Sequence, residues 1–222
     1  MIYFFADNHY GVQPGKVIFE HLPEALRSRI RFYEDDWSVL ENENWESGCE
    51  LLILHLIGAT CKIPHPGEGA EKRVRDYISR GGNILLLHGS SAAFWQWPWW
   101  RELPGERWVR PGDPDSERIS THPHKPCRVT VSSTRHPLAK KLKEMDLPND
   151  EIYTNLENTC PVMRLMETHI EEGTFVQACE ALTPFGGRIV SFIPGHKPEV
   201  TSMPVLIENV TTLIDYLLGG AQ

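Results

Sequence analysis

The stretch Gly81-Gly82-Asn83-Ile84-Leu85-Leu86-Leu87-His88-Gly89-Ser90-Ser91 constrains the fold more than any other part of the chain. Its Gly-Gly pair permits the positive φ angles that end a helix and reverse the chain. Four apolar residues without alternation then predict a strand buried on both faces of a parallel sheet. His88 follows this strand, at the edge where open α/β sheets bind ligands and where related folds place a nucleophile. We therefore expect a functional site around this imidazole.

The rest of the chain alternates between similar apolar strands and amphipathic helices. Strands are predicted at residues 2–5, 30–33, 49–57, 84–87, 175–181 and 188–193, and helices at 17–29, 70–80, 135–142 and 204–218. This order indicates an α/β fold with a doubly wound, mainly parallel sheet and helices on both faces. The alternating segment 127–132 predicts an antiparallel strand inside a β-rich insertion at about 122–181. We expect residues 1–222 to form a single domain.

Composition excludes several classes of function. The chain has 222 residues and a formal net charge of −8, which argues against binding to nucleic acid phosphates. No apolar run approaches the roughly 20 residues that cross a bilayer, and the first residues predict a strand rather than a signal peptide. Five cysteines without a C-x-x-C pair indicate neither a disulfide framework nor a zinc ribbon. We therefore expect a reduced, cytoplasmic protein.

Histidines follow four of the predicted strands. They are His9, His55, His88 and His196. Because parallel strands end at the same edge of a sheet, these imidazoles can converge there, either to bind a divalent metal or to act as acid and base. Asp7, Asp150 and Glu151 could add carboxylates. For His9 and His55 a hydrogen-bonded loop is the favoured alternative, whereas the glycines beside His88 and His196 favour function.

Two further groups of residues have a structural and a functional interpretation. His122 and His124 form an H-x-H pair that could bind metal, but no further ligand stands at a diagnostic spacing. Five tryptophans crowd residues 95–108, and Trp95 and Trp97 could stack on a sugar ring. Packing in the body, or against a second subunit in a homo-oligomer, is the favoured alternative for this run.

These motifs resemble those of the ThuA-like (trehalose utilisation) family, within the class I glutamine amidotransferase-like superfamily. The resemblance rests on Gly81–Gly89, His136-Pro137-Leu138, Asp150-Glu151-Ile152-Tyr153 and Gly186–Val190 leading to Gly195-His196, in this order. It implies a flavodoxin-like fold and a role in sugar metabolism, with His88, Glu151, Tyr153 and His196 as candidate catalytic residues. The loop at Asp7-Asn8-His9 departs from the family's usual Gly-His-x-x-His pattern.

The glutaminase activity of the superfamily is not expected here. It requires a thiolate at the strand-to-helix turn, activated by a histidine. That turn carries His88, and Cys61 and Cys160 lie in segments that cannot occupy it.

The sequence therefore supports two hypotheses. The first is an enzyme acting on a sugar or sugar derivative, by hydrolysis or by proton transfer next to a carbonyl. A divalent metal, most plausibly zinc, would be held by His88 and His196 with His9 and His55, and no nucleotide cofactor is expected. The alternative is a non-catalytic carbohydrate-binding or interaction protein with the same fold, which would rely on Trp95 and Trp97.

Overall fold

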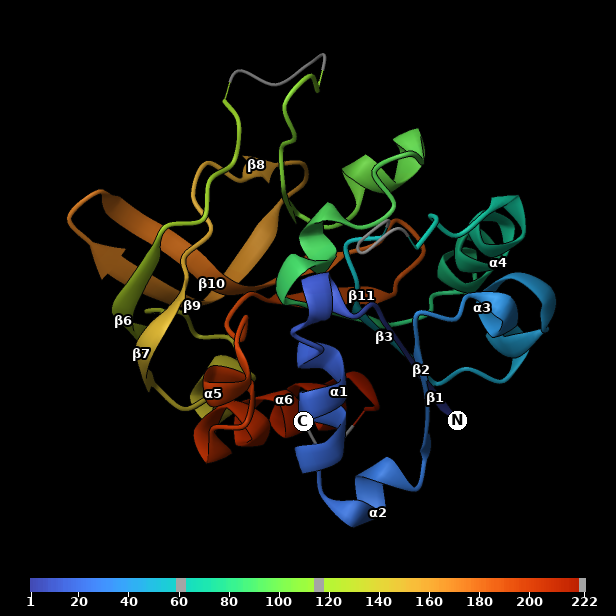
Figure 1. The fold of residues 1–222 in the computed structure, drawn as a ribbon, viewed down its shortest axis with the longest axis horizontal. Coiled ribbons are helices and arrows are strands. Elements are labelled where there is room, and N and C mark those ends of the chain that lie inside the picture. Colours follow the sequence, from blue (N-terminus) through green and yellow to red (C-terminus); the bar gives the residue numbers. More distant parts are fainter. Residues whose placement is uncertain (59–62, 114–117, 220–222) are drawn as a thin grey trace.

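The computed structural model describes residues 1–58, 63–113 and 118–219 (Figure 1). The strands are β1 (Ile2–Ala6), β2 (Ile30–Glu34), β3 (Leu51–His55), β4 (Ile84–Leu87), β5 (Glu106–Arg107), β6 (His124–Val131), β7 (Met145–Glu151), β8 (Glu157–Asn158), β9 (Val162–Ile170), β10 (Gly173–Leu182) and β11 (Arg188–Phe192). The α-helices are α1 (Pro14–His21), α2 (Glu24–Arg27), α3 (Ser38–Asn42), α4 (Glu68–Ser79), α5 (Pro198–Thr201) and α6 (Pro204–Leu217). Short 3₁₀ segments include His9–Gly11 and His88–Ala92.

A nine-stranded sheet runs through the described part of the chain, in the order β2-β1-β3-β4-β11-β10-β9-β6-β7. The first five strands in this order pair in parallel, and the last four extend the sheet through antiparallel pairs. The α/β, flavodoxin-like fold expected from the sequence is confirmed. The β-rich insertion therefore extends the main sheet, while its short strand β8 pairs antiparallel with β5 in a separate two-stranded sheet.

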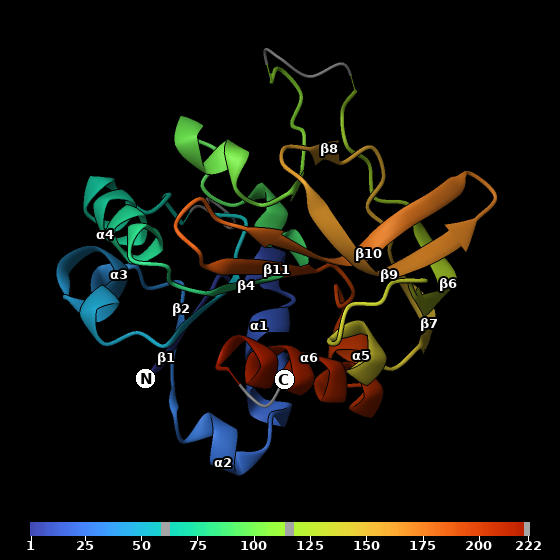
Figure 2. The same cartoon turned by 180° about the vertical axis from the view of Figure 1, so that it is seen from behind.

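Helices cover both faces of the parallel half (Figures 1 and 2). On one face, α1, α5 and α6 pack on alternate strand residues such as Phe4, Ile53 and Leu85. On the other face, α3 and α4 pack on the intervening residues, including Phe5 and Leu54. Because both faces are covered, β4 is apolar along its whole length and β1, β3 and β11 are mostly apolar, which explains the absence of alternation in the sequence.

The insertion departs in part from the sequence-based expectations. The antiparallel strand expected at 127–132 is confirmed, as part of β6. The expected helix at 135–142 is wrong, since that segment contains only the 3₁₀ turn Ala139–Lys141. Pro137 accounts for the difference, because a proline keeps the residue before it out of the helical region.

No helix among the described residues is both long and apolar enough to cross a membrane.

Candidate active site

The candidate site lies where the parallel strands end. His9 follows β1, His55 is the last residue of β3, His88 follows β4, and His196 follows β11. β1, β3, β4 and β11 are successive neighbours in the sheet and point the same way, so their carboxyl ends share one edge. The sequence-based expectation that these four imidazoles lie at one edge of the sheet is therefore met.

Two of these histidines have strained backbones. His9 and His88 both have φ of 47°, in the left-handed region that non-glycine residues seldom adopt. The turn at His88 is held by Ser90, whose hydroxyl accepts from the Leu56 N–H at 2.9 Å and donates to the Leu54 carbonyl at 2.8 Å. Strain of this kind persists where surrounding contacts enforce it, and it is concentrated at functional sites.

Two buried aspartates fix the loops that carry the histidines. Asp7 accepts hydrogen bonds from the N–H groups of His9, Ile57 and Gly58, at 2.9–3.1 Å. Asp150 accepts from the N–H of Gly195 at 2.7 Å and from that of His196 at 2.9 Å. These carboxylates therefore position the imidazoles through the backbone.

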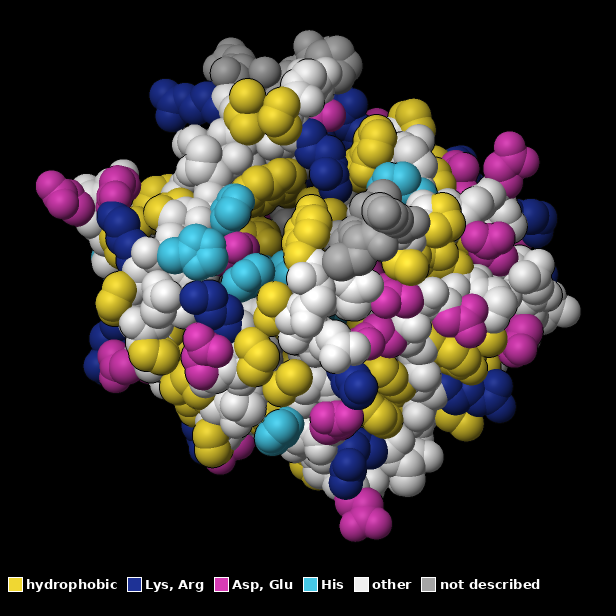
Figure 3. Space-filling view, viewed as in Figure 1, with side chains coloured by type: hydrophobic (Ala, Val, Ile, Leu, Met, Phe, Trp, Pro, Cys, Tyr) yellow, Lys and Arg dark blue, Asp and Glu magenta, His cyan; other side chains and the backbone are white. Residues whose placement is uncertain are grey.

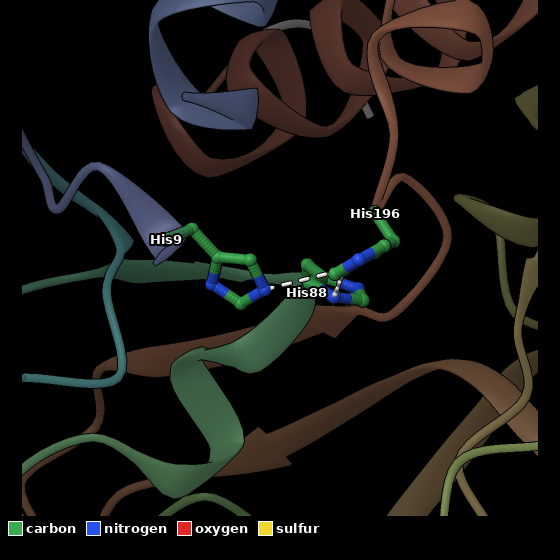
Figure 4. Close-up of side chains that lie close together, drawn as sticks. All are labelled: His9, His88 and His196. Carbon is green, nitrogen blue, oxygen red and sulfur yellow. Dashed lines mark hydrogen bonds between the residues drawn. The ribbon is translucent and has the colours of Figure 1, made fainter. Parts of the chain in front are cut away.

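Three imidazoles point toward one another from separate segments of the chain (Figure 4). His196 Nδ1 lies 3.2 Å from His9 Nε2 and 3.2 Å from His88 Nε2. His88 Nδ1 lies 2.8 Å from the Ile193 carbonyl oxygen, which can only accept, so Nδ1 carries a proton. A neutral His88 therefore has its lone pair on Nε2, facing His196.

The antiparallel half of the sheet supplies a carboxylate and a phenol to this cluster. Glu151, at the end of β7, places Oε2 3.3 Å from His88 Nε2. The Tyr153 hydroxyl lies 3.2 Å from the same nitrogen. On the other side of Glu151, Oε1 lies 3.1 Å from His122 Nδ1 and 3.2 Å from His124 Nε2. Glu151 thus lies between two groups of imidazoles.

Burial keeps most of the central imidazoles neutral. It lowers the pKa of His9 to about 3, with a further contribution from the neighbouring His88 and His196. Burial likewise lowers the pKa of His55 far below its usual range, and it lowers that of His196. Neutral imidazole nitrogens that carry lone pairs are what a divalent cation requires.

Glu151 reverses this effect for His88. Burial alone would lower the pKa of His88, but the hydrogen bond and the charge of Glu151 raise it. Burial would raise the pKa of Glu151, but the same hydrogen bond and charge lower it to about 2, so the carboxylate is ionised at neutral pH. Burial raises the pKa of Tyr153 well above its usual value, and its phenol stays protonated.

A cavity of about 220 Å³ opens onto the cluster, lined among others by His9, Glu151, Tyr153 and Arg110. Figure 3 shows histidine side chains gathered around a hollow on this face, with an acidic side chain among them. Arg110 donates from Nη2 to the Ala92 carbonyl oxygen at 3.1 Å, and no carboxylate among the described residues forms an ion pair with it. Its guanidinium also lies 5.3 Å from the centroid of the Trp95 ring, and the side chain lines the cavity, where it can donate to an oxygen of a bound ligand.

The remaining candidate residues, His55, Trp95 and Trp97, do not line the cavity. His55 is fully buried behind the cluster, and neither ring nitrogen has a hydrogen-bond partner. Its ring nitrogens join neither of the groups that could hold a metal ion among the described residues. Trp97 is 3% exposed and stacks on Phe94, so its ring is part of the core. Trp95 is 46% exposed but does not line the cavity.

Neither the place of Arg110 at the cavity nor the association of His122 and His124 with Glu151 is apparent from the sequence. No local pattern marks Arg110. The H-x-H pair was a signal, but its third partner lies on β7, and the pairing of His124 with Glu151 across β6 and β7 is visible only in the folded chain.

The donor set fits a zinc-type cation. Ring nitrogens bound about 2.0–2.1 Å from a tetrahedral zinc lie roughly 3.4 Å apart. The two contacts at 3.2 Å among His9, His88 and His196 are close to that separation. The Ile193 carbonyl fixes the tautomer of His88, as second partners of metal-binding histidines commonly do.

The model of the ThuA family, described as trehalose utilisation, matches residues 9–216. The chain belongs to the ThuA family. No functionally curated protein sequence matches it.

Solved structures of a ThuA-like protein and of two other proteins share the fold. A ThuA-like protein from Parabacteroides merdae is 15% identical, with a TM-score of 0.75 over 100% of this chain and 90% of that one. A cytoplasmic protein from Salmonella typhimurium is 12% identical, with a TM-score of 0.64 over 97% of this chain and 98% of the other. The glutaminase domain of a CTPS from Trypanosoma brucei is also 12% identical, with a TM-score of 0.59 over 100% and 95%.

This ThuA-family chain carries His88, not a cysteine, at the turn after β4. Among the described cysteines, Cys160 lies beside the Leu103 carbonyl, and burial raises the pKa of its thiol. Cys61 lies outside the described residues. The chemistry of the site therefore depends on imidazoles, a carboxylate and a phenol.

Proposed function

We propose that the protein is an enzyme of carbohydrate metabolism whose active site is the cavity above His9, His88 and His196. The substrate is a sugar derivative, and the reaction is hydrolysis or proton transfer next to a carbonyl. The observation that carries the proposal is the convergence of His9 Nε2 and His88 Nε2 on His196 Nδ1, each at 3.2 Å. Membership of the trehalose utilisation family supports the substrate class.

The three imidazoles would hold a divalent cation, most plausibly zinc. When bound, such an ion supplies Lewis acidity toward a substrate oxygen or a water molecule. His55, whose ring nitrogens lie outside this group, is not among the proposed ligands.

The neighbouring side chains have distinct roles in this proposal. Glu151, with a pKa of about 2, is an orienting carboxylate or a base, since a general acid would have to be protonated at neutral pH. The protonated Tyr153 hydroxyl donates a hydrogen bond to a substrate oxygen. Arg110, on the cavity wall, donates to another oxygen and orients the sugar.

The alternative of a carbohydrate-binding protein depended on an exposed aromatic surface. The burial of Trp97 removes one of its two rings, and the other, Trp95, lies outside the lining of the cavity. Buried, strained and charged groups at a cavity favour catalysis over simple sugar binding.

The test begins with metal content. We expect stoichiometric zinc in the untagged protein after incubation with Zn²⁺ and dialysis, and loss of that zinc in the variant His88→Ala, His196→Ala. The matched control replaces His21 and His169, two exposed histidines, by alanine and should retain the zinc. Zinc that stays in the His88, His196 variant would refute the proposed centre.

The second step is activity. A panel of glycosides, sugar lactones and oxidised sugars is assayed with wild-type protein and with Glu151→Gln and Tyr153→Phe. We expect each substitution to lower kcat by about 10²-fold or more, since each removes a group that would act in the transition state. Wild-type kcat in both variants would overturn their assignment to the site.

A further inference from the structure

His122 and His124 are not used by the proposed centre, yet both approach its carboxylate. His122 lies just before β6, and His124 begins that strand. Residues two apart on an extended chain point to the same side. The register of β6 against β7 places His124 opposite Glu151, and Glu151 Oε1 lies 3.1 Å from His122 Nδ1 and 3.2 Å from His124 Nε2.

Glu151 divides its two oxygens between the two groups of imidazoles. Oε2 faces His88 Nε2 at 3.3 Å, on the side of the proposed centre. Oε1 faces His122 and His124, and it lies 3.5 Å from His196 Nδ1 as well. A carboxylate oxygen offers about two lone pairs, so three imidazoles converge on an oxygen that can accept about two hydrogen bonds.

The second group also has the dimensions of a metal site. Ligands about 2.0–2.2 Å from a tetrahedral zinc lie roughly 3.3–3.5 Å apart. The two separations from Oε1, 3.1 and 3.2 Å, are close to that value, and the ligand atoms of His122, His124 and Glu151 all lie within 4.8 Å of one another. Carboxylates that bind one ion through each oxygen are a natural link between paired cations.

We propose that this protein binds two divalent cations, one on each side of Glu151. The first is held by His9, His88 and His196, and the second by His122, His124 and Glu151 Oε1. The inference rests on the proposed function for its first site. Two imidazoles and one carboxylate select a cation of the zinc type over magnesium or calcium, which prefer oxygen.

The second ion would lie where a ligand enters. His122 lines both the cavity above the cluster and an adjoining open groove of about 740 Å³, and Trp108 lines both as well. The side chains of His122 and His124 are 50% and 39% exposed, whereas those of His9 and His88 are 3% and 0% exposed. The second ion is therefore the more accessible of the two, and we expect it to bind more weakly and to exchange faster.

The test is the stoichiometry of binding. Chelator-treated, full-length protein is titrated with Zn²⁺ alone in a calorimeter, and its zinc content is measured at saturation. We expect two ions per chain in the wild type and one in the variant His122→Ala, His124→Ala. Alanine at His21 and His169 should leave two. Cobalt(II) absorption, which reports the ligands directly, should show two additive spectra in the wild type and one in the His122, His124 variant.

The outcomes separate this inference from the proposed function. One ion in the wild type, lost on His88→Ala, His196→Ala and kept on His122→Ala, His124→Ala, would refute the second site and leave the first standing. One ion with the opposite pattern would refute both the first centre and the pair. Two ions that persist in the His122, His124 variant would refute the ligands assigned here.

Discussion

His55 offers a sharp test of how the buried imidazoles affect stability. It is fully buried, neither ring nitrogen has a partner, and burial holds its pKa far below 6.5. A buried polar group without a hydrogen bond costs about 1–3 kcal/mol. His55→Leu, which replaces the ring by an apolar side chain of similar size, should therefore raise the free energy of unfolding of the metal-free protein by about 1–2 kcal/mol at about pH 8.

The same substitution should change the pH dependence. In the unfolded chain His55 titrates near its usual pKa of 6.5, while the folded protein keeps it neutral. Between these two pKa values protons bind the unfolded chain preferentially, so stability present above about pH 6.5 is lost as the pH falls. At pH 5.5 the loss is RT ln(1 + 10), about 1.4 kcal/mol, for each such histidine. Because leucine does not titrate, His55→Leu avoids this loss. Its free energy of unfolding should therefore exceed that of the wild type by about 2.5–3.5 kcal/mol at pH 5.5.

The assay is urea unfolding in the presence of a chelator at about pH 8 and about pH 5.5. His55→Gln is the matched control, because it cannot titrate but keeps a polar group in the same site. Its stability relative to the wild type should grow by about the same 1.4 kcal/mol between pH 8 and pH 5.5, without the gain at the higher pH. The reasoning fails if the difference between wild type and His55→Leu is the same, within about 0.5 kcal/mol, at both pH values.

Three further substitutions test other parts of the structure. Asp150→Asn weakens the hydrogen bonds that position His196, and we expect zinc affinity, measured by calorimetry, to fall about 10- to 100-fold while the fold is retained. In Gly89→Ala the added Cβ would lie 2.7 Å from Ile57 Cγ1 and 3.2 Å from His9 Cε1, so both side chains must shift, and zinc affinity should fall about 10-fold with little change in the circular dichroism spectrum. Trp97→Ala opens a cavity at a side chain that is 3% exposed and should cost about 3–5 kcal/mol in urea unfolding; a loss below about 1 kcal/mol would contradict its place in the core.

The parallel half of the fold could be predicted because its signals are local. Apolar runs mark β1, β3, β4 and β11, and strands that pair in parallel end at one edge of the sheet. These signals predict His9, His55, His88 and His196 at that edge, but loop geometry decides which ring nitrogens meet, as those of His9, His88 and His196 do. His55, the last residue of β3, shows the difference, because its ring nitrogens join neither group that could hold a metal ion among the described residues.

The side-chain contacts of the antiparallel half could not be predicted in the same detail. The approach of Glu151 to His122 and His124 depends on the register between β6 and β7, which long-range pairing sets. The tryptophan run gave two interpretations because composition does not reveal whether a ring is covered. Trp97 is covered in the folded chain, by Phe94 among others.

The division of the sheet into two halves has a consequence for how such a site can diversify. The deeply buried imidazoles come from the parallel half, whereas Glu151, Tyr153 and the H-x-H pair come from the antiparallel extension. The extension joins the parallel half through the pairing of β10 with β11. A chimera carrying a foreign extension on this parallel half should therefore keep the inner imidazoles while acquiring new groups around them.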